Sequence, residues 1–174
     1  CFGEFAPQIF AIETGLSSSP SMNWRIKELD HRSIVSFSDA HSGPKLGREA
    51  TVFETRNNEQ ETGNSEISYD DIYAAIAGAS LKVHAGKLKI GFTIEFYPEE
   101  GKYHYTGHRN CNVKLSPEET VKKGTLCPIC GKSLTQGVMQ RVEQLAGRSE
   151  ESLKLKVQKV QEVQQVQSRA FPNR

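Results

Sequence analysis

Four metal-binding side chains in the second half of the chain constrain its fold more than any other feature of the sequence. Two residues separate His108 from Cys111, two separate Cys127 from Cys130, and fifteen lie between the two pairs. Two ligands three positions apart on a tight turn approach one ion together, and two such turns complete a tetrahedron. The spacing therefore predicts a structural zinc site. Because the protein fills all four positions, we expect this zinc to stabilise the fold without taking part in chemistry.

Two alternatives exist for these residues. The cysteines can be free thiols packed in a core, and His104 can take the place of His108 as fourth ligand, although its spacing is longer. We favour the site with His108, because Gly107 and Gly131 supply the backbone freedom that two tight turns require.

The overall composition excludes several classes of protein. The formal net charge is only +1 over 174 residues, so there is no global basic field of the kind that indicates nucleic-acid binding. No apolar run approaches the roughly 18 residues of a membrane span, and the first residues show no secretion signal. Together with the clustered cysteines, these features predict a cytoplasmic protein without a membrane partner. The chain opens on Cys1, and a strand pattern follows almost at once, so we expect a fragment of a longer protein.

The first forty residues predict a strand–helix–strand unit. We expect a strand over 8–13, a capped helix over 20–30 and a second strand over 33–37. Two strands joined by a helix within so short a span are expected to be parallel. Their carboxyl ends then carry Glu13 and Asp39, at the edge where parallel α/β folds build their sites.

The middle of the chain predicts one loop, one helix and one strand. Residues 54–67 are polar and read as an exposed loop, and Ser68 caps the helix that follows. Residues 89–98 alternate as a strand does, with Phe92 and Ile94 on one face.

The composition changes near residue 96 and again at Ser149, which divides the chain into three parts. Ser116 and Glu119 form a capping box before a short helix, and a second amphipathic helix follows the cysteines. We therefore predict a first domain over 1–95, a zinc-binding domain over 96–148 and a helical or disordered tail over 149–174.

Asp39 and His41 form the second candidate site. On an extended strand, residues two apart point the same way, so this pair can share a metal at a strand end. The alternative is a surface turn, with Asp39 capping and His41 in solvent. A metal centre also needs more ligands than this segment offers, and the chain contains no pair of histidines two positions apart.

Five stretches of the sequence resemble endonuclease Q, a nuclease whose catalytic domain belongs to the polymerase and histidinol phosphatase (PHP) superfamily. The resemblance runs over about residues 2–148 and rests on long motifs in nearly the family's order. They are FAIETGLSSSPSMNWR, SFSDAHSGPKLGREA, FTIEFYPEEGKYHYTGHRNC, LSPEET and CPICGKSLTQGVMQRVEQLAGR.

The resemblance implies an α/β fold and a repair activity. The fold would be the C-terminal portion of a PHP-type distorted (β/α) barrel, followed by a small zinc-ribbon-like domain and a helical tail. The activity would be metal-dependent nicking of DNA on the 5′ side of uracil, hypoxanthine, xanthine or an abasic site. Damaged DNA is then the partner, and any replication or repair proteins that assist are unknown.

The resemblance also assigns roles to residues near the strand ends. The SDAH segment matches the last metal-binding motif of the barrel, so Asp39 and His41 become ligands of catalytic Mg²⁺, Mn²⁺ or Zn²⁺. Residues expected to lie near substrate are Glu13 and Ser17, with Lys45 and Arg48 meeting backbone phosphates. Arg48 has an alternative role in a solvated charge pair with Glu49.

Around the predicted zinc site, four side chains can either supply aromatic and basic contacts to DNA or pack against the two ligand turns: Lys102, Tyr103, Tyr105 and Arg109.

Two departures from the family set limits on the activity expected of this chain. The family's early metal motifs are absent, and beyond Gly147 the resemblance stops. We therefore expect enzyme activity from an intact parent, with this chain alone binding catalytic metal poorly. Two rival functions remain, a non-catalytic zinc-ribbon module that binds nucleic acid or protein, and a PHP phosphoesterase that acts on a small phosphate ester.

Overall fold

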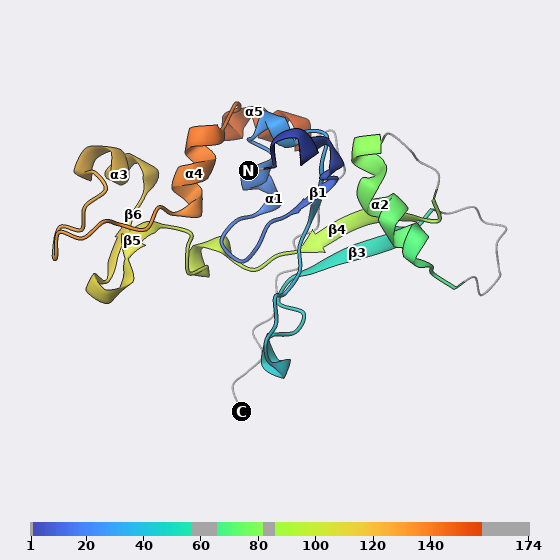
Figure 1. Ribbon diagram of the computed structural model, residues 1–174, viewed down its shortest axis with the longest axis horizontal. Helices are drawn as coiled ribbons and strands as arrows, with labels where there is room; N and C mark the ends of the chain where they lie inside the picture. The colour runs from blue at the N-terminus through green and yellow to red at the C-terminus, as the bar shows by residue number, and fades with distance from the viewer. Residues whose placement is uncertain (1, 57–65, 82–85, 158–174) are drawn as a thin grey trace.

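The described part of the chain is a mixed α/β structure built from three two-stranded sheets and short helices. The computed structural model describes residues 2–56, 66–81 and 86–157. Figure 1 shows an elongated molecule, with a small sheet at one end, an antiparallel strand pair and a long helix at the other, and a parallel strand pair between them. Among the described residues, no helix combines the length and apolar character that crossing a membrane requires.

The strand pair at the centre confirms the prediction of parallel strands. β1 (Ala11–Glu13) runs parallel to β2 (Ser33–Val35), with Ala11 opposite Ser33 and Glu13 opposite Val35. The crossover between them contains α1 (Pro20–Asn23) and a 3₁₀ turn over Lys27–Leu29. Both strands therefore end at the same edge of the sheet, as the sequence predicts.

The predicted helix over 20–30 is wrong in length, because α1 is a single turn. Its start is as expected, since the Ser19 hydroxyl accepts a hydrogen bond from the Met22 backbone N–H at 3.4 Å. The side chain of Asn23 is buried and donates to the Ser18 hydroxyl and the Ser19 carbonyl, both at 2.9 Å. A side chain bonded to the backbone in this way competes with the helical ladder. Ile26 then becomes extended and buried.

Strand β3 is absent from the sequence prediction, which placed residues 54–67 in a loop. β3 (Ala50–Thr55) pairs antiparallel with β4 (Leu88–Ile94), so Glu54 and Thr55 belong to a strand. Lys89 of β4 forms an ion pair with Glu54 at 3.1 Å, and this cross-strand pairing accommodates the charge that made the segment read as loop. The rest of the predicted loop, 57–65, lies outside the described residues.

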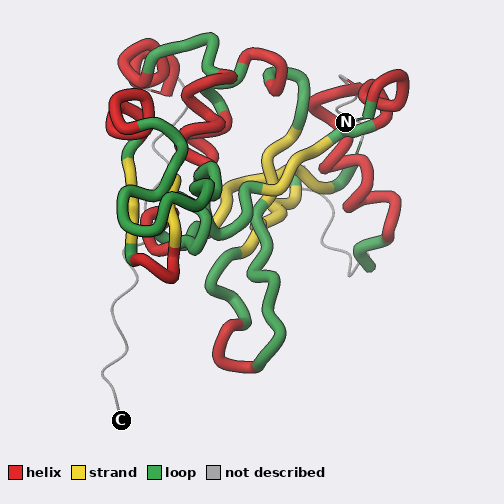
Figure 2. The backbone as a smooth tube through the Cα atoms, turned by 60° about the vertical axis from the view of Figure 1, so that its left-hand side comes forward, coloured by secondary structure: helices red, strands yellow, loops and turns green. Residues whose placement is uncertain are grey.

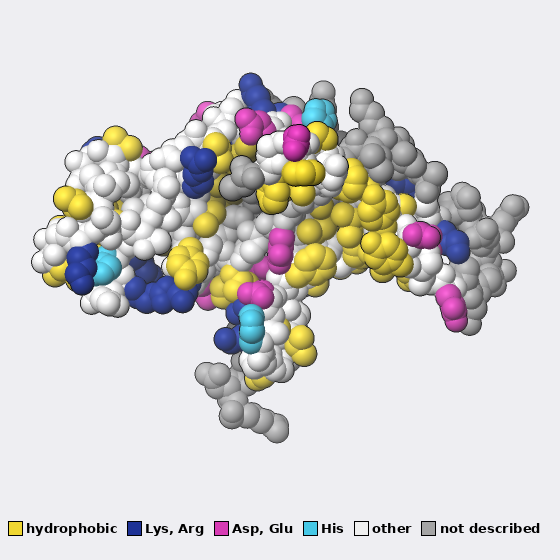
Figure 3. Space-filling view, viewed as in Figure 1, with side chains coloured by type: hydrophobic (Ala, Val, Ile, Leu, Met, Phe, Trp, Pro, Cys, Tyr) yellow, Lys and Arg dark blue, Asp and Glu magenta, His cyan; other side chains and the backbone are white. Residues whose placement is uncertain are grey.

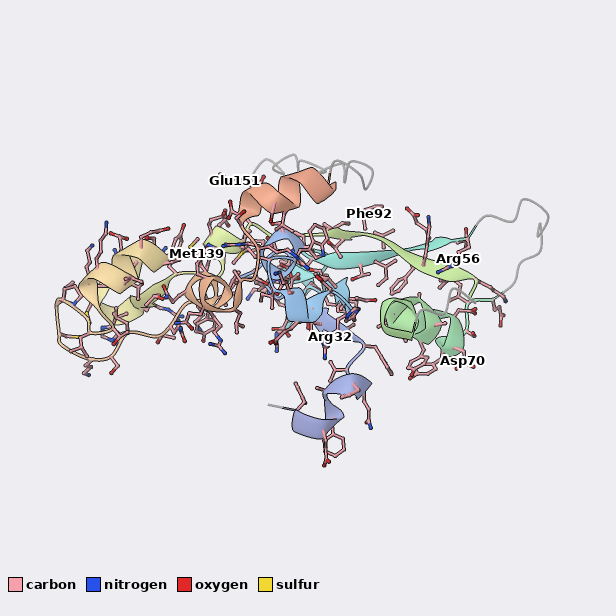
Figure 4. The ribbon with its side chains drawn as sticks, turned by 90° about the horizontal axis from the view of Figure 1, so that it is seen from above. Arg32, Arg56, Asp70, Phe92, Met139 and Glu151 are labelled. Atoms are coloured by element: carbon pink, nitrogen blue, oxygen red, sulfur yellow. The ribbon has the colours of Figure 1, made fainter. Side chains whose placement is uncertain are left out.

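A bulge at Gly91 reverses the face that β4 presents. Phe53 pairs with Ile90 and Val52 with Phe92, so Gly91 has no partner in the ladder. A Cβ at this position would lie 2.5 Å from the Glu54 side chain, so a larger residue would require Glu54 to move. The side chains of β4 that precede the bulge face α2. Beyond the bulge, Phe92 lies on the opposite face of the β3–β4 sheet, as Figure 4 shows.

Helix α2 (Tyr69–Leu81) packs against β2 and β4. The predicted cap is confirmed, because the Asp71 N–H donates to the Ser68 hydroxyl at 3.2 Å and the Asp71 carboxylate accepts from the Ser68 N–H at 3.0 Å. Hydrogen bonds from Ser68 lower the pKa of Asp71. In Figure 3, hydrophobic side chains gather where α2 meets the β3–β4 sheet.

The remaining elements form the metal-binding end of the molecule and a return to its centre. β5 (Thr106–His108) and β6 (Val113–Leu115) form an antiparallel hairpin, followed by α3 (Pro117–Lys123) with the predicted capping box. α4 (Val138–Leu145) and α5 (Glu150–Val157) come next. The predicted tail is therefore helical at its start, and 158–174 lie outside the described residues.

Helix α4 and the segment after it are fastened to the crossover of the parallel pair by two arginines. Arg25 forms an ion pair with Glu143, and the backbone N–H of Gly147 donates to the Arg25 carbonyl at 2.9 Å. Arg148 forms an ion pair with Asp30. Both arginine side chains are largely buried, with exposed fractions of 12% and 14%, so these contacts are screened less than ordinary surface pairs.

The loop after β1 packs directly on the segment that leads into β5. The Ser17 hydroxyl accepts a hydrogen bond from the Tyr103 N–H at 3.2 Å, and the Ser17 carbonyl accepts one from His104 Nδ1 at 2.9 Å. Gly101 permits this approach, because a Cβ there would collide with the Leu16 carbonyl oxygen and lie 2.6 Å from the Ser17 Cα. The two segments are thus joined through backbone atoms with little room to adjust.

Replacing Gly101 with alanine is expected to lower the free energy of unfolding by about 2 kcal/mol, because the added methyl group overlaps backbone atoms. Urea denaturation followed by circular dichroism measures the change. Gly43→Ala is the matched control, since a Cβ at Gly43 meets no atom within 4 Å. Equal stabilities of the two variants would contradict this account of the junction.

Candidate functional site

The predicted zinc ligands lie together at one end of the molecule. The ligand atoms of His108, Cys111, Cys127 and Cys130 all lie within 4.8 Å of one another. His108 Nδ1 is 3.2 Å from the sulfur of Cys111 and 3.2 Å from that of Cys130. The three cysteines form no disulfide with one another. Three sulfurs and one imidazole at these separations are a donor set that suits tetrahedral zinc.

Each ligand pair is placed by its own turn. His108 ends β5, and Cys111 ends a 3₁₀ turn that closes on Asn112 at a left-handed φ of 51°. In the second turn, the Cys127 N–H donates to the Lys132 carbonyl at 2.7 Å and the Gly131 N–H donates to the Cys127 carbonyl at 2.8 Å. Gly131 has a φ of +71°, which confirms that this turn requires glycine.

Gly107 has a different role from the one predicted. Its φ is not positive; instead a Cβ would collide with the Val113 carbonyl oxygen across the hairpin. Gly107 also exchanges two backbone hydrogen bonds of 2.9 Å with Thr135, which joins the second turn to β5. This glycine therefore allows three backbone segments to meet beside the ligands.

The thiols of the cluster differ in acidity. Burial alone would raise the pKa of Cys127, but the N–H groups of Cys130 and Ile129 and the His108 side chain donate to its sulfur, and its pKa falls to about 6. A hydrogen bond with Cys130, then burial and a hydrogen bond with Cys127, raise the pKa of Cys111 to about 11. Because thiols bind a divalent cation as thiolates, metal binding to this cluster would displace protons.

His104 is not part of this cluster. Only 1% of the residue is exposed, its Nδ1 donates to Ser17, and its ring lies edge-on to Tyr105 with the centroids 4.7 Å apart. The rival assignment of His104 as fourth ligand is therefore wrong. His104 instead fastens the zinc-binding end to the loop after β1.

Asp39 and His41 lie on the long connection between β2 and β3. Strand β2 ends at Val35, so the argument that an extended strand aligns the two side chains does not apply. Asp39 has a φ of 45°, and His41 Nδ1 donates to the Asp39 backbone carbonyl at 2.9 Å. Figures 1 and 2 show this connection, around the 3₁₀ turn at Gly43–Lys45, projecting from the body of the molecule.

The geometry at His41 suits a metal ligand in one respect. With Nδ1 protonated and bonded to a carbonyl, Nε2 is the neutral nitrogen that can bind a cation, which is the usual arrangement of metal-bound histidines. Both Asp39 and His41 are exposed. The described residues place no third histidine, cysteine or acid beside them that would complete a metal site.

The residues predicted near substrate have varied positions. Glu13 is exposed at the end of β1, and Lys45 is exposed in the 3₁₀ turn of the projecting connection. The Ser17 hydroxyl accepts a backbone hydrogen bond from Tyr103. Arg48 donates from Nε to the Ser38 carbonyl at 2.9 Å, so it braces the segment just before Asp39.

A buried polar cluster at the strand ends was missed by sequence reasoning. Thr14 and Ser36 are the first residues beyond β1 and β2, and the Thr14 hydroxyl donates to the Ser36 hydroxyl at 3.0 Å. Both hydroxyls reach one oxygen of Glu95 at 3.3 Å. Ser36 also bonds Glu49, which accepts from the Phe96 N–H at 3.4 Å. The register of two parallel strands places Thr14 and Ser36 together, a signal available in the sequence; the acids come from distant segments.

The alternative of a solvated charge pair between Arg48 and Glu49 is wrong, because only 2% of Glu49 is exposed. Burial raises its pKa to about 7, with the nearby Glu95 adding to the effect. Burial also raises the pKa of Glu95. Glu49 Oε2 and Glu95 Oε1 have no hydrogen-bond partner among the described residues, so this cluster is held at an electrostatic cost.

Comparisons with known proteins place these features in a family context. No family model matches the sequence. The chain is 33% identical over 137 residues to the uncharacterized protein MJ0043 of Methanocaldococcus jannaschii, covering 78% of this chain and 16% of that protein. It is 27% identical over 143 residues to the uncharacterized protein YqxK of Bacillus subtilis, covering 82% of this chain and 32% of that protein.

Two solved structures share both the sequence and the fold. One is the lesion-specific endonuclease PfuEndoQ of Pyrococcus furiosus, with 33% identity and a TM-score of 0.61 over 81% of this chain. The other is endonuclease Q in complex with a 27-mer duplex that carries an abasic lesion at the active site, with 32% identity and a TM-score of 0.63 over 79% of this chain.

The chain is endonuclease Q-like. It spans 32% of each endonuclease Q structure and between 16% and 32% of the curated relatives. The resemblance inferred from the sequence motifs is thereby confirmed. The structural likeness covers about four fifths of the chain.

The raised pKa of Glu49 predicts a pH-dependent stability. The carboxyl titrates at 4.5 when unfolded and at about 7 when folded, so the native state binds the extra proton. The binding of this proton contributes to the free energy of unfolding. That contribution is complete below about pH 4.5 and is lost as the pH rises toward 7. Glu49→Gln mimics the protonated acid. The melting temperature of Glu49→Gln minus that of wild type is expected to increase between pH 5 and pH 8.

Differential scanning fluorimetry across this pH range measures the effect, with Glu99→Gln, at an exposed carboxyl, as the control. Comparison at equal pH cancels any titration of the cysteine cluster. A difference between Glu49→Gln and wild type that stays constant with pH would overturn the assignment.

Removal of zinc is expected to unfold residues 100–148 before the parallel strand pair, because the two ligand turns have few other contacts to hold them. Hydrogen exchange with and without a strong chelator measures this, and β5 and β6 should lose protection first. Cys130→Ser should behave as the chelated protein does, whereas Ser133→Ala, at an adjacent non-ligand, should not. Zinc-free protein with full protection at β5 would refute the site.

Proposed function

We propose that this chain belongs to a metal-dependent DNA endonuclease of repair, which nicks the backbone on the 5′ side of deaminated bases or abasic sites. The observation that carries the proposal is the likeness to endonuclease Q bound to a duplex with an abasic lesion, at 32% identity over 79% of the chain. Sequence identity at this level together with a shared fold supports a shared mode of action more strongly than fold alone.

Asp39 and His41 supply two ligands of the catalytic metal in this proposal. The two residues would hold Mg²⁺, Mn²⁺ or Zn²⁺, and such an ion would supply Lewis acidity for activating a water and for offsetting negative charge at the phosphate. The His41–Asp39 carbonyl bond orients the imidazole, and the Arg48–Ser38 bond braces the loop. The remaining ligands come from outside the described residues, as part of a PHP-type barrel.

The surrounding residues position the DNA. Glu13 ends β1, and Ser17 and Lys45 lie on the loops that follow β1 and β2. In this proposal Lys45 meets a backbone phosphate. In this division, residues 1–95 contribute to the catalytic domain, 96–148 form a zinc-ribbon-like domain and 149–174 form a tail. The zinc has a structural role, and the target nucleotide turns out of the stack at a cost of a few kcal/mol.

One observation favours a second function, a non-catalytic zinc module that binds nucleic acid or protein. The described residues complete the ligand set at His108, Cys111, Cys127 and Cys130, but not at Asp39 and His41. A chain that binds DNA without cutting it would have this pattern.

Nicking of a duplex that contains uracil, hypoxanthine or an abasic site tests the proposal, with this chain and with a version extended at its N-terminus. In the presence of Mg²⁺ or Mn²⁺, the extended protein should nick the lesion strand. Asp39→Asn and His41→Gln should each lower the rate at least 100-fold, since each removes a metal ligand. His31→Gln, at an exposed histidine elsewhere, is the control.

Nicking at wild-type rates by both ligand variants would refute the assignment of Asp39 and His41. Binding of the same duplex with no nicking by the extended protein would favour the non-catalytic module. Hydrolysis of a small phosphate ester without nicking would favour a PHP phosphoesterase.

A further inference from the structure

An exposed aromatic ring lies close to two cations at the junction of the zinc-binding end and the loop after β1. Half of Tyr103 is exposed. Lys102 Nζ lies 5.3 Å from the centre of its ring and Arg109 Cζ lies 5.9 Å from it. Tyr103 comes from the segment before β5 and Arg109 from the turn between the first two zinc ligands, so two separate parts of the fold build this cluster.

The backbone of Tyr103 is held on both sides. Its N–H donates to the Ser17 hydroxyl at 3.2 Å, and its carbonyl accepts from the Val138 N–H at 2.8 Å. The next residue, His104, is buried. An aromatic side chain on a fixed backbone loses little conformational entropy when it binds a partner, so the ring is prepared for contact rather than for core packing.

Tyr105 separates from this group. It is half-buried with its ring edge-on to His104, at an interplanar angle of 86°, and therefore serves as packing. Of the four side chains that the sequence singled out, the three exposed ones are Lys102, Tyr103 and Arg109.

The two cations are available to an anionic partner. Within the described part of the chain, neither Lys102 nor Arg109 forms an ion pair with an acid, in contrast to Arg25 and Arg148. Figure 3 shows lysine and arginine side chains gathered along the lower edge of the zinc-binding end. Because the net charge of the whole chain is only +1, this is a local concentration of positive charge and not a general property of the surface.

We propose that Lys102, Tyr103 and Arg109 form a contact surface for a DNA strand, with the cations on backbone phosphates and the tyrosine ring stacked on an unpaired base or a sugar. An aromatic face beside two cations matches a nucleic-acid strand, since every base has a π face and every linkage a negative charge. The surface touches Ser17, so it continues the path of the DNA from the strand-end loops to the zinc-binding end. This inference rests on the proposed function and names the part of the chain that holds the flanking DNA.

Fluorescence anisotropy with the zinc-loaded full chain tests the surface, using a labelled single strand, an abasic duplex and an intact duplex over a range of salt concentrations. Lys102→Gln and Arg109→Gln are each expected to reduce the slope of log affinity against log salt by about one, as loss of one phosphate contact does. Tyr103→Ala should weaken binding of the single strand roughly tenfold. Tyr103→Phe, which keeps the ring, should bind within twofold of wild type.

Lys122→Gln, at an exposed lysine of α3, is the matched control and should leave the slope unchanged. A Lys102→Glu/Arg109→Glu variant keeps the Tyr103 backbone contacts and should abolish binding even if Tyr103→Ala proves unstable in a thermal melt.

The inference and the proposed function fail in different ways. If the extended protein does not nick but DNA binding depends on these three residues, the surface stands and the nuclease assignment falls. If nicking occurs while all the variants bind as wild type does, the surface is refuted. A poly-glutamate peptide that competes as well as DNA of equal charge would also refute it, because the stacking contribution would then be absent.

Discussion

The parallel pairing of β1 with β2 is the constraint on which the rest of the structure depends. Because both strands end at one edge, the loops that follow them lie side by side, and Thr14 meets Ser36 through a direct hydrogen bond. Everything with functional interest is fastened to this edge: the connection that carries Asp39, the buried carboxyl of Glu49 and, through Ser17, the zinc-binding end. A slip in this pairing would separate all of them.

The zinc-binding end has a dual dependence on sequence and packing. A metal bound by its four candidate ligands would close its two turns, while its position relative to the strand ends is set by backbone contacts that tolerate only glycine at Gly101. The Arg25–Glu143 ion pair then returns α4 to the crossover. Metal binding therefore stabilises a local unit, and close packing makes that unit a rigid neighbour of the strand-end loops.

Local signals made the ligands, the caps and the parallel strands predictable from sequence. His108 and Cys127 are each followed by a cysteine at a fixed spacing. Ser116 forms, with Glu119, the capping box that begins α3. What could not be predicted depends on contacts between distant segments. The side chain of Asn23 ends α1 early, and the bulge at Gly91 depends on the register in which two distant strands pair. The partial burial of acids at the strand ends is likewise a tertiary effect.

The proposed nuclease function requires a metal ion bound by Asp39 and His41. The most direct measurement is the anomalous diffraction of manganese in crystals of the N-terminally extended protein. We predict an anomalous peak within bonding distance of His41 Nε2 and an Asp39 carboxylate oxygen. Manganese bound elsewhere, with both side chains free in solvent while the crystallised protein still nicks DNA, would contradict the account.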